Sequence, residues 1–162
     1  MIRDLLEQRT ELDRKIAEEQ HQAAMTAWED AKTKAREAKE NVGKMRQAFN
    51  QASNEWSNYE LECQHVQISL EHHEAAKPKH DDLPTEAELE AWERKRHRLR
   101  RTLSGPMYTR RQNLASNRER ARIDLINADA AFVQMAYAER NARAKALGEN
   151  GLPPSELSRV VL

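Results

Sequence analysis

One apolar repeat, from Ala24 to His73, constrains the fold of this chain more than any other feature. Its positions follow one another in steps of three or four, and fourteen of the fifteen are apolar. They are Ala24, Trp28, Ala31, Ala35, Ala38, Val42, Met45, Phe49, Ala52, Trp56, Tyr59, Cys63, Val66, Leu70 and His73. A repeat that averages about 3.5 residues keeps an apolar stripe against one partner helix when the two helices supercoil. The sequence therefore predicts a coiled-coil arm.

The composition favours helices throughout. Charged residues make up 33% of the 162 residues, aromatic residues only 5%, and there are four glycines. Strong helix formers dominate, and no stretch shows the apolar-polar alternation of a half-buried strand. We therefore expect an all-α protein, a long antiparallel coiled-coil helical hairpin that forms a single elongated domain over residues 1–162.

Two prolines mark the point where the chain folds back. The first helix is expected over residues 2–75. Residues 76–84 are expected to form the hairpin tip, because Pro78 and Pro84 each disfavour helix at the residue before them.

A capping box marks the start of the second helix. Thr85 and Glu88 have the spacing at which a hydroxyl and a carboxylate satisfy the free amides of a helix N-terminus. The second helix is therefore expected over residues 85–104. Gly105-Pro106 then breaks the second arm, since proline at a first helical position permits a new helix to start.

The third helix is expected over residues 106–147, with Gly148 as its C-terminal cap and a short tail over residues 148–162. Because the chain folds back at the tip, residues whose numbers add up to about 160 are expected to lie opposite each other. Trp56 would then face the Gly105-Pro106 break, where a missing side chain leaves room for an indole. We expect Trp56 to be a buried anchor of the hairpin.

Charge is segregated along a chain whose formal net charge is zero. Residues 55–93 carry eleven acidic and two basic side chains, whereas residues 94–122 carry eleven basic side chains and the single acid Glu119. The basic residues are Arg94, Lys95, Arg96, Arg98, Arg100, Arg101, Arg110, Arg111, Arg118, Arg120 and Arg122. In the expected register the opposing residues 41–58 offer only Glu55 as an acid. This basic segment is therefore expected to stay positive and to bind an anionic partner.

Apolar residues outside the repeat from Ala24 to His73, which we call the main seam or simply the seam, predict self-association. The stripe slips by one residue near Gln20 and His21, so the apolar row near the amino terminus does not join the main seam. A second apolar row lies on the third helix. The surplus residues are Ile2, Leu5, Leu6, Leu12, Ile16, Ile126, Val133 and Tyr137. Such a patch exceeds what a monomer usually exposes, so we expect a homodimer or small homo-oligomer, unless the apolar end of the tail, Val160 to Leu162, covers it.

No motif predicts catalysis. The sequence has no Gly-rich phosphate loop, His-Glu-x-x-His motif, Cys-x-x-Cys motif or serine nucleophile elbow. Metal-ligand residue types gather near the tip, but Glu62 and His65 form only one Glu-x-x-His pair, where a di-iron bundle needs two. We expect no enzymatic activity, no metal site and no cofactor.

The amino terminus and the lone cysteine bear on localisation. Asp4 stands where a signal peptide needs a basic region followed by an apolar one, and no apolar run is long enough to span a membrane. Cys63 falls on the seam, where a thiol usually behaves as a small apolar side chain. We expect a cytoplasmic protein without membrane association.

Two functions fit these patterns. The first is a non-enzymatic interaction or scaffold protein that docks on a larger assembly or on itself. The alternative is a nucleic-acid-binding protein in which the basic segment is a phosphate track that does not read sequence.

Overall fold

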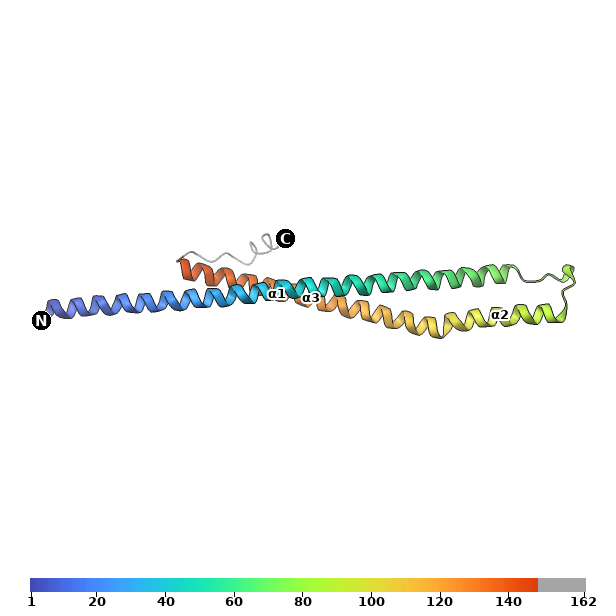
Figure 1. Cartoon of the computed structure of the whole chain (residues 1–162), viewed down its shortest axis with the longest axis horizontal. Coiled ribbons are helices and arrows are strands. Elements are labelled where there is room, and N and C mark those ends of the chain that lie inside the picture. Colours follow the sequence, from blue (N-terminus) through green and yellow to red (C-terminus); the bar gives the residue numbers. More distant parts are fainter. Residues whose placement is uncertain (149–162) are drawn as a thin grey trace. The chain divides into compact units, whose positions relative to one another are not determined.

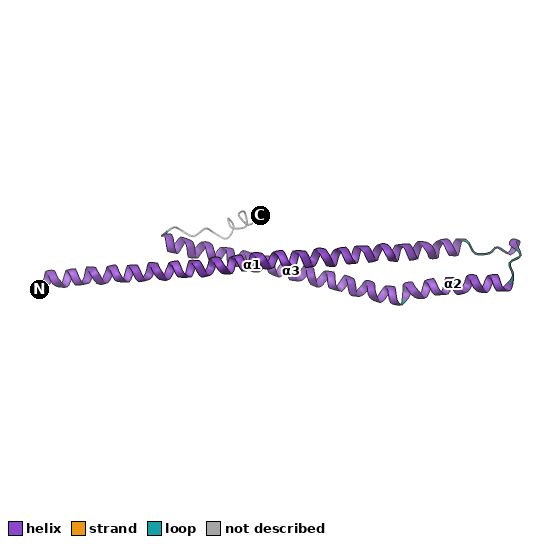
Figure 2. Cartoon of the chain, viewed as in Figure 1, coloured by secondary structure: helices purple, strands orange, loops and turns teal. Residues whose placement is uncertain are grey.

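The computed structural model describes residues 1–148, which form three α-helices and one short 3-10 helix (Figures 1 and 2). In chain order these are α1 (Ile2–Ala75), η1 (His80–Asp82), α2 (Glu86–Ser104) and α3 (Pro106–Leu147). Within the described residues there is no strand, and the expected all-α helical hairpin with a broken second arm is confirmed. α1 and α3 have the bounds expected from the sequence, and α2 begins one residue later.

Contacts between helices divide the chain into two compact units. One unit holds Met1–Arg46 and the chain from Asp124 onward, and the other holds Gln47–Ile123. Both α1 and α3 contribute to each unit. The expected cover of the apolar patch by the end of the tail concerns residues outside the described part of the chain, and it stays a prediction.

The seam predicted for the first helix is the buried stripe of α1. All fifteen positions from Ala24 to His73 are buried or half-buried, whereas nearly all α1 residues between them are exposed. Val42, Tyr59 and Leu70 are among the most buried side chains of the protein. The repeat of about 3.5 residues therefore identifies the packed face correctly.

The tip is built by turn and cap geometry in the second unit. Lys79 is extended, η1 follows, and Leu83 adopts the left-handed conformation with φ of 47°. The amide of Glu88 donates to Thr85 Oγ1 at 3.2 Å, and the amide of Thr85 donates to Glu88 Oε2 at 3.0 Å. The capping box that starts α2 is thereby confirmed.

The predicted register of the hairpin is wrong at the tip. His73 contacts Trp92, which lies several positions further along the second arm than the expected partner. The reason is that the chain leaves α1 in an extended conformation before it turns. An extended residue advances about 3.3 Å against about 1.5 Å in a helix, so α2 starts beyond the end of α1 (Figure 1).

The break at Gly105 shifts the register further. From His73 to Glu60 α1 uses thirteen residues, whereas the second arm uses nineteen from Trp92 to Arg111. Figure 1 shows why, since the second arm bends away from α1 where α2 meets α3 and follows a longer path. Trp56 consequently packs against Arg118, and the prediction that it faces the break is wrong.

Gly105 allows this bend because it has no side chain. Its amide donates to the carbonyl oxygen of Arg101 at 3.0 Å, and its own carbonyl accepts from the amide of Thr109 at 3.1 Å. A Cβ at position 105 would lie 3.0 Å from that same Arg101 oxygen, which is a tight contact with backbone. Pro106 then starts α3 without needing an amide partner.

Candidate interaction surfaces

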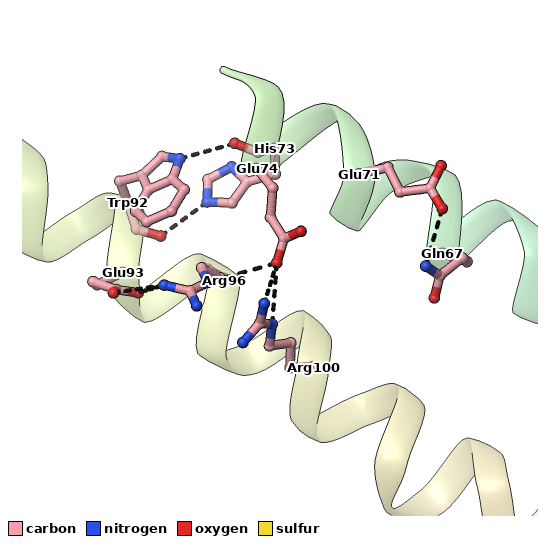
Figure 3. Close-up of polar contacts among 8 residues, drawn as sticks. All are labelled: Gln67, Glu71, His73, Glu74, Trp92, Glu93, Arg96 and Arg100. Carbon is pink, nitrogen blue, oxygen red and sulfur yellow. Dashed lines mark hydrogen bonds and ion pairs between the residues drawn. The ribbon is translucent and has the colours of Figure 1, made fainter. Parts of the chain in front are cut away.

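A reciprocal contact between His73 and Trp92 fixes α2 against the end of α1 (Figure 3). The indole Nε1 of Trp92 donates to the carbonyl oxygen of His73 at 2.9 Å, and His73 Nε2 lies 2.8 Å from the carbonyl oxygen of Trp92. The two rings stack with centroids 5.1 Å apart. A proton on Nε2 lets both side chains act as donors, so each satisfies the backbone of the other residue. Trp92 is buried.

Glu74 extends this contact to the basic segment, residues 94–122. Arg100 donates to Glu74 Oε1 from Nη2 at 2.6 Å and from Nε at 3.1 Å. The Nε atom of Arg96 lies 3.6 Å from the same oxygen, and its Nη1 donates to Glu93 at 2.8 Å. Figure 3 shows one carboxylate from α1 between two guanidinium groups of α2. These two arginines therefore link α2 to the end of α1.

Arg111 is also engaged across the hairpin. Its guanidinium donates to both carboxylate oxygens of Glu60, with Nη2 2.9 Å from Oε2. The side chain of Glu60 is only 15% exposed. The hydrogen bonds that Arg111 donates to Glu60 raise the pKa of Arg111 above its ordinary range, because they favour the charged form.

Two further arginines pack on aromatic rings of α1. The guanidinium carbon of Arg118 lies 4.9 Å from the ring centroid of Trp56, and Arg118 Nε donates to Ser53 Oγ at 3.3 Å. Arg110 lies 4.8 Å from the ring of Tyr59. Burial raises the pKa of the Tyr59 hydroxyl, and the charge of Arg110 acts in the opposite direction. Both cations contribute to packing between the helices.

Arg122 pairs within its own helix. Its Nη2 and Nε donate to the two oxygens of Glu119 at 2.6 and 2.9 Å. This bond lowers the pKa of Glu119 and raises that of Arg122.

The structure thus divides the eleven basic residues into two groups. Six are engaged with carboxylates or rings: Arg96, Arg100, Arg110, Arg111, Arg118 and Arg122. The side chains of the other five have no ion pair or hydrogen bond to any described residue: Arg94, Lys95, Arg98, Arg101 and Arg120. The expectation that the opposing helix offers only Glu55 is wrong, because the shifted register brings Glu60 and Glu74 to the basic segment.

Three of the unengaged arginines form one face of α2. Arg94, Arg98 and Arg101 follow the spacing of a single helix face, and His97 lies among them. We call these four residues the open arginine face. They line an open hollow of about 620 Å³ at the break, together with Thr102, Ser104, Gly105 and Pro106. This face gathers three of the five basic side chains that have no ion pair or hydrogen bond to a described residue.

The second candidate surface is the amino-terminal part of α1. Residues 1–23 are all exposed, although α1 continues through them without a break. Five apolar side chains there are 50 to 78% exposed. They are Ile2, Leu5, Leu6, Leu12 and Ile16. These aliphatic side chains at coiled-coil spacing form an apolar row that the described residues leave exposed.

The apolar residues of α3 form a separate surface. Ile126 and Val133 are 51 and 41% exposed, and Tyr137 is half-buried. Glu139 accepts a hydrogen bond from Trp28 Nε1 at 2.9 Å, which places this part of α3 along α1 beyond Trp28. The twelve residues from Ile16 to Trp28 span about 18 Å of helix. The single apolar patch that was expected is therefore divided in two, one on the amino-terminal part of α1 and one on α3.

The metal-ligand residue types near the tip are dispersed in the structure. Cys63 is buried in the seam and His73 is stacked on Trp92. Across residues 1–148 no group of three such side chains comes together to hold a metal ion. Among the helices of this same range, none is long and apolar enough to cross a membrane.

Sequence reasoning missed the α1 side chains that engage the arginines. Ser53, Glu60 and Glu74 follow the heptad period directly beside the seam, where side chains reach across to the partner helix. That spacing is a usable signal. Which arginine each of these side chains meets could be known only from the true register of the hairpin.

Searches of protein-family models, curated proteins and solved structures find no match to this chain. The fold and its surfaces define a class, an all-α helical hairpin with an exposed helical extension and one open basic face.

Proposed function

We propose that this protein is a non-enzymatic coiled-coil interaction protein, a scaffold of the cytoplasm that docks on a larger assembly or on another copy of itself. The observation that carries the proposal is the row from Ile2 to Ile16. The hairpin buries its own seam from Ala24 to His73, while the same helix presents a second, exposed apolar row. A helix exposed on all sides and apolar on one is typical of a segment that completes its packing with a partner.

The energetics support an interaction through this row. Burial of each aliphatic side chain contributes roughly 1.5–3 kcal/mol, and Leu5, Leu12 and Ile16 from each of two chains would provide six. Association costs roughly 4–15 kcal/mol in lost freedom of motion. The free energy gained by burial therefore exceeds the free energy lost on association over most of these ranges. This balance predicts a dimer of moderate affinity.

Size-exclusion chromatography with light scattering tests the proposal. The full chain should elute as a dimer or small oligomer at tens of micromolar, and a variant with Leu5→Gln, Leu12→Gln and Ile16→Gln should be a monomer of equal helicity. The matched control is Glu7→Gln with Arg14→Gln, because these exposed residues lie on the opposite side of the same helix. Equal mass for all three proteins would reject the row as an interaction surface.

The open arginine face favours a second candidate function, binding of nucleic acid through phosphates. Arg94, Arg98 and Arg101 have no carboxylate partner among the described residues, and a hydroxyl-bearing hollow adjoins them. Phosphate contacts release counterions, so each one adds about 0.9 to the slope of log affinity against log salt on duplex DNA. Filter binding at several salt concentrations should give a slope of roughly 2 to 3 if this face alone makes the contacts.

A further inference from the structure

We propose that the partner of the amino-terminal row is a second copy of this chain, bound antiparallel through residues 5–23, with Arg9 of each copy facing Glu19 of the other. This inference rests on the proposed function and specifies its partner, orientation and register.

The exposed row contains charges as well as aliphatic side chains. Continued in steps of three and four, it runs through α1 up to the start of the main seam. Its positions are Ile2, Leu5, Arg9, Leu12, Ile16, Glu19 and Ala23. Every one of them is exposed. Any helix that packs on this row must therefore accommodate one cation and one anion at the interface.

The two charges decide the orientation. In a parallel dimer equivalent residues face each other, so Arg9 would meet Arg9 and Glu19 would meet Glu19, which are like charges at seam positions. In an antiparallel dimer with Leu12 opposite Ile16, the sum of facing positions is constant along the row, and Arg9 falls opposite Glu19. Two-fold symmetry forms this pair twice.

The row lies on a different side of α1 from the main seam. One extra residue between the two stripes turns the apolar face by about 100° around the helix axis. α3 follows the main seam, since Glu139 reaches Trp28 and Ala146 is buried at its end. A second copy of α1 can therefore pack on the row without displacing α3.

A groove in the first unit lies where the proposed register places Leu5 of the second copy. Where the end of α3 lies against α1 there is an open groove of about 1160 Å³ lined largely by alanine. The lining includes Ala23, which is the last position of the row. The proposed register places Leu5 of the second copy opposite Ala23, so that a large side chain meets small ones.

Existing contacts within the chain leave the charged pair available. Arg9 lies 4.0 Å from Asp13, but both side chains are more than two-thirds exposed, and such a pair contributes little. The symmetry axis also brings Lys15 near its own copy, and likewise Asp13. Lys15 has Glu11 within 3.8 Å to offset that repulsion. The repulsion between these like charges limits the dimer to moderate affinity.

Charge reversal in the full chain tests the register. The dimer dissociation constants of the wild type, Arg9→Glu, Glu19→Arg and the double variant are measured by sedimentation equilibrium. Each single reversal creates two like-charged pairs per dimer and should raise the dissociation constant about tenfold. The double variant restores both pairs and should return to within about threefold of the wild type. The control is Arg14→Glu, because Arg14 points away from the row and should leave the constant unchanged.

The outcomes separate this inference from the proposed function. A wild type that dimerises but loses no affinity on single reversal, or regains none in the double variant, overturns the antiparallel register and leaves self-association standing. A wild type that stays monomeric at the highest attainable concentration overturns the inference and self-association together. Recovery in the double variant alone supports the register, since a parallel dimer would still pair like charges.

Discussion

At the scale of single residues, Trp92 and His73 form a contact between the two arms in which each side chain meets the backbone carbonyl oxygen of the other residue. Trp92→Ala should destabilise the protein by about 3–5 kcal/mol, because it removes a buried indole and leaves the carbonyl oxygen of His73 without a donor. Trp56→Ala should cost less, since Trp56 is half-buried and packs against a charged side chain. Urea unfolding followed by circular dichroism measures both. A loss below about 0.5 kcal/mol for Trp92→Ala would show that the contact is not structural.

Two titrating groups of the seam predict the alkaline limit of stability. Burial raises the pKa of the Cys63 thiol above its ordinary 9.0, with Glu60 acting in the same direction, and burial raises the pKa of Tyr59 above its ordinary 10.0. The unfolded chain therefore loses these protons first as the pH rises. The contribution of Cys63 is fully present below pH 9.0 and that of Tyr59 below pH 10.0, and each is lost as the pH rises through the raised pKa of the folded state.

Urea midpoints at pH 7, 9 and 10.5 check this dependence. The midpoint should fall between the last two values, and the fall should be smaller in Cys63→Ala, in which only Tyr59 remains. In the same protein at pH 7, a disulfide reagent should react with Cys63 slowly when folded and quickly in urea, because burial limits both access and thiolate. Rapid reaction in the folded state would contradict the buried position.

At the scale of helices, local signals in the sequence were sufficient for the bounds and the packed face. The prolines, the Thr85 cap and the Gly105 break act on neighbouring backbone, so their effect is readable without knowing the partner. The register was not readable in this way. It depends on the extended path before η1 and on the bend at Gly105, and both are properties of three-dimensional geometry.

The same limit explains why the basic segment was only partly predicted. Its charge is visible in the sequence, but which arginines stay free depends on which carboxylates reach them. Glu74 and Glu60 engage Arg100 and Arg111, whereas Arg94 and Arg98 face away from these carboxylates.

The division of the arginines predicts two different phenotypes. Changing Arg94, Arg98 and Arg101 to Gln should leave the helicity and the urea midpoint nearly unchanged, since glutamine is also a good helix former and no cross-helix pair is lost. Changing Arg100 and Arg111 to Gln should lower stability by roughly 0.5–2 kcal/mol, because each bonds a carboxylate of α1. Any binding of duplex DNA should weaken far more in the first variant. The reverse pattern would mean that the open arginine face holds the hairpin together.

At the scale of the whole molecule, the chain combines a closed seam with two surfaces that its own described residues leave open. The apolar row of α1 is the surface for which we propose a helical partner, and the open arginine face is the surface for which we propose an anion. Neither surface has the enclosed, convergent polar geometry of a catalytic site. Both surfaces lie outside the buried seam from Ala24 to His73.

Sedimentation equilibrium of the full chain, and of a chain that ends at Gly148, tests the proposed interaction most directly. Both proteins should associate at tens of micromolar, because the row from Ile2 to Ile16 is exposed in the described structure and belongs to α1. Association of the shortened chain alone would show that the tail covers the row within one molecule. A full-length chain that sediments as a monomer throughout this range would contradict self-association through the row.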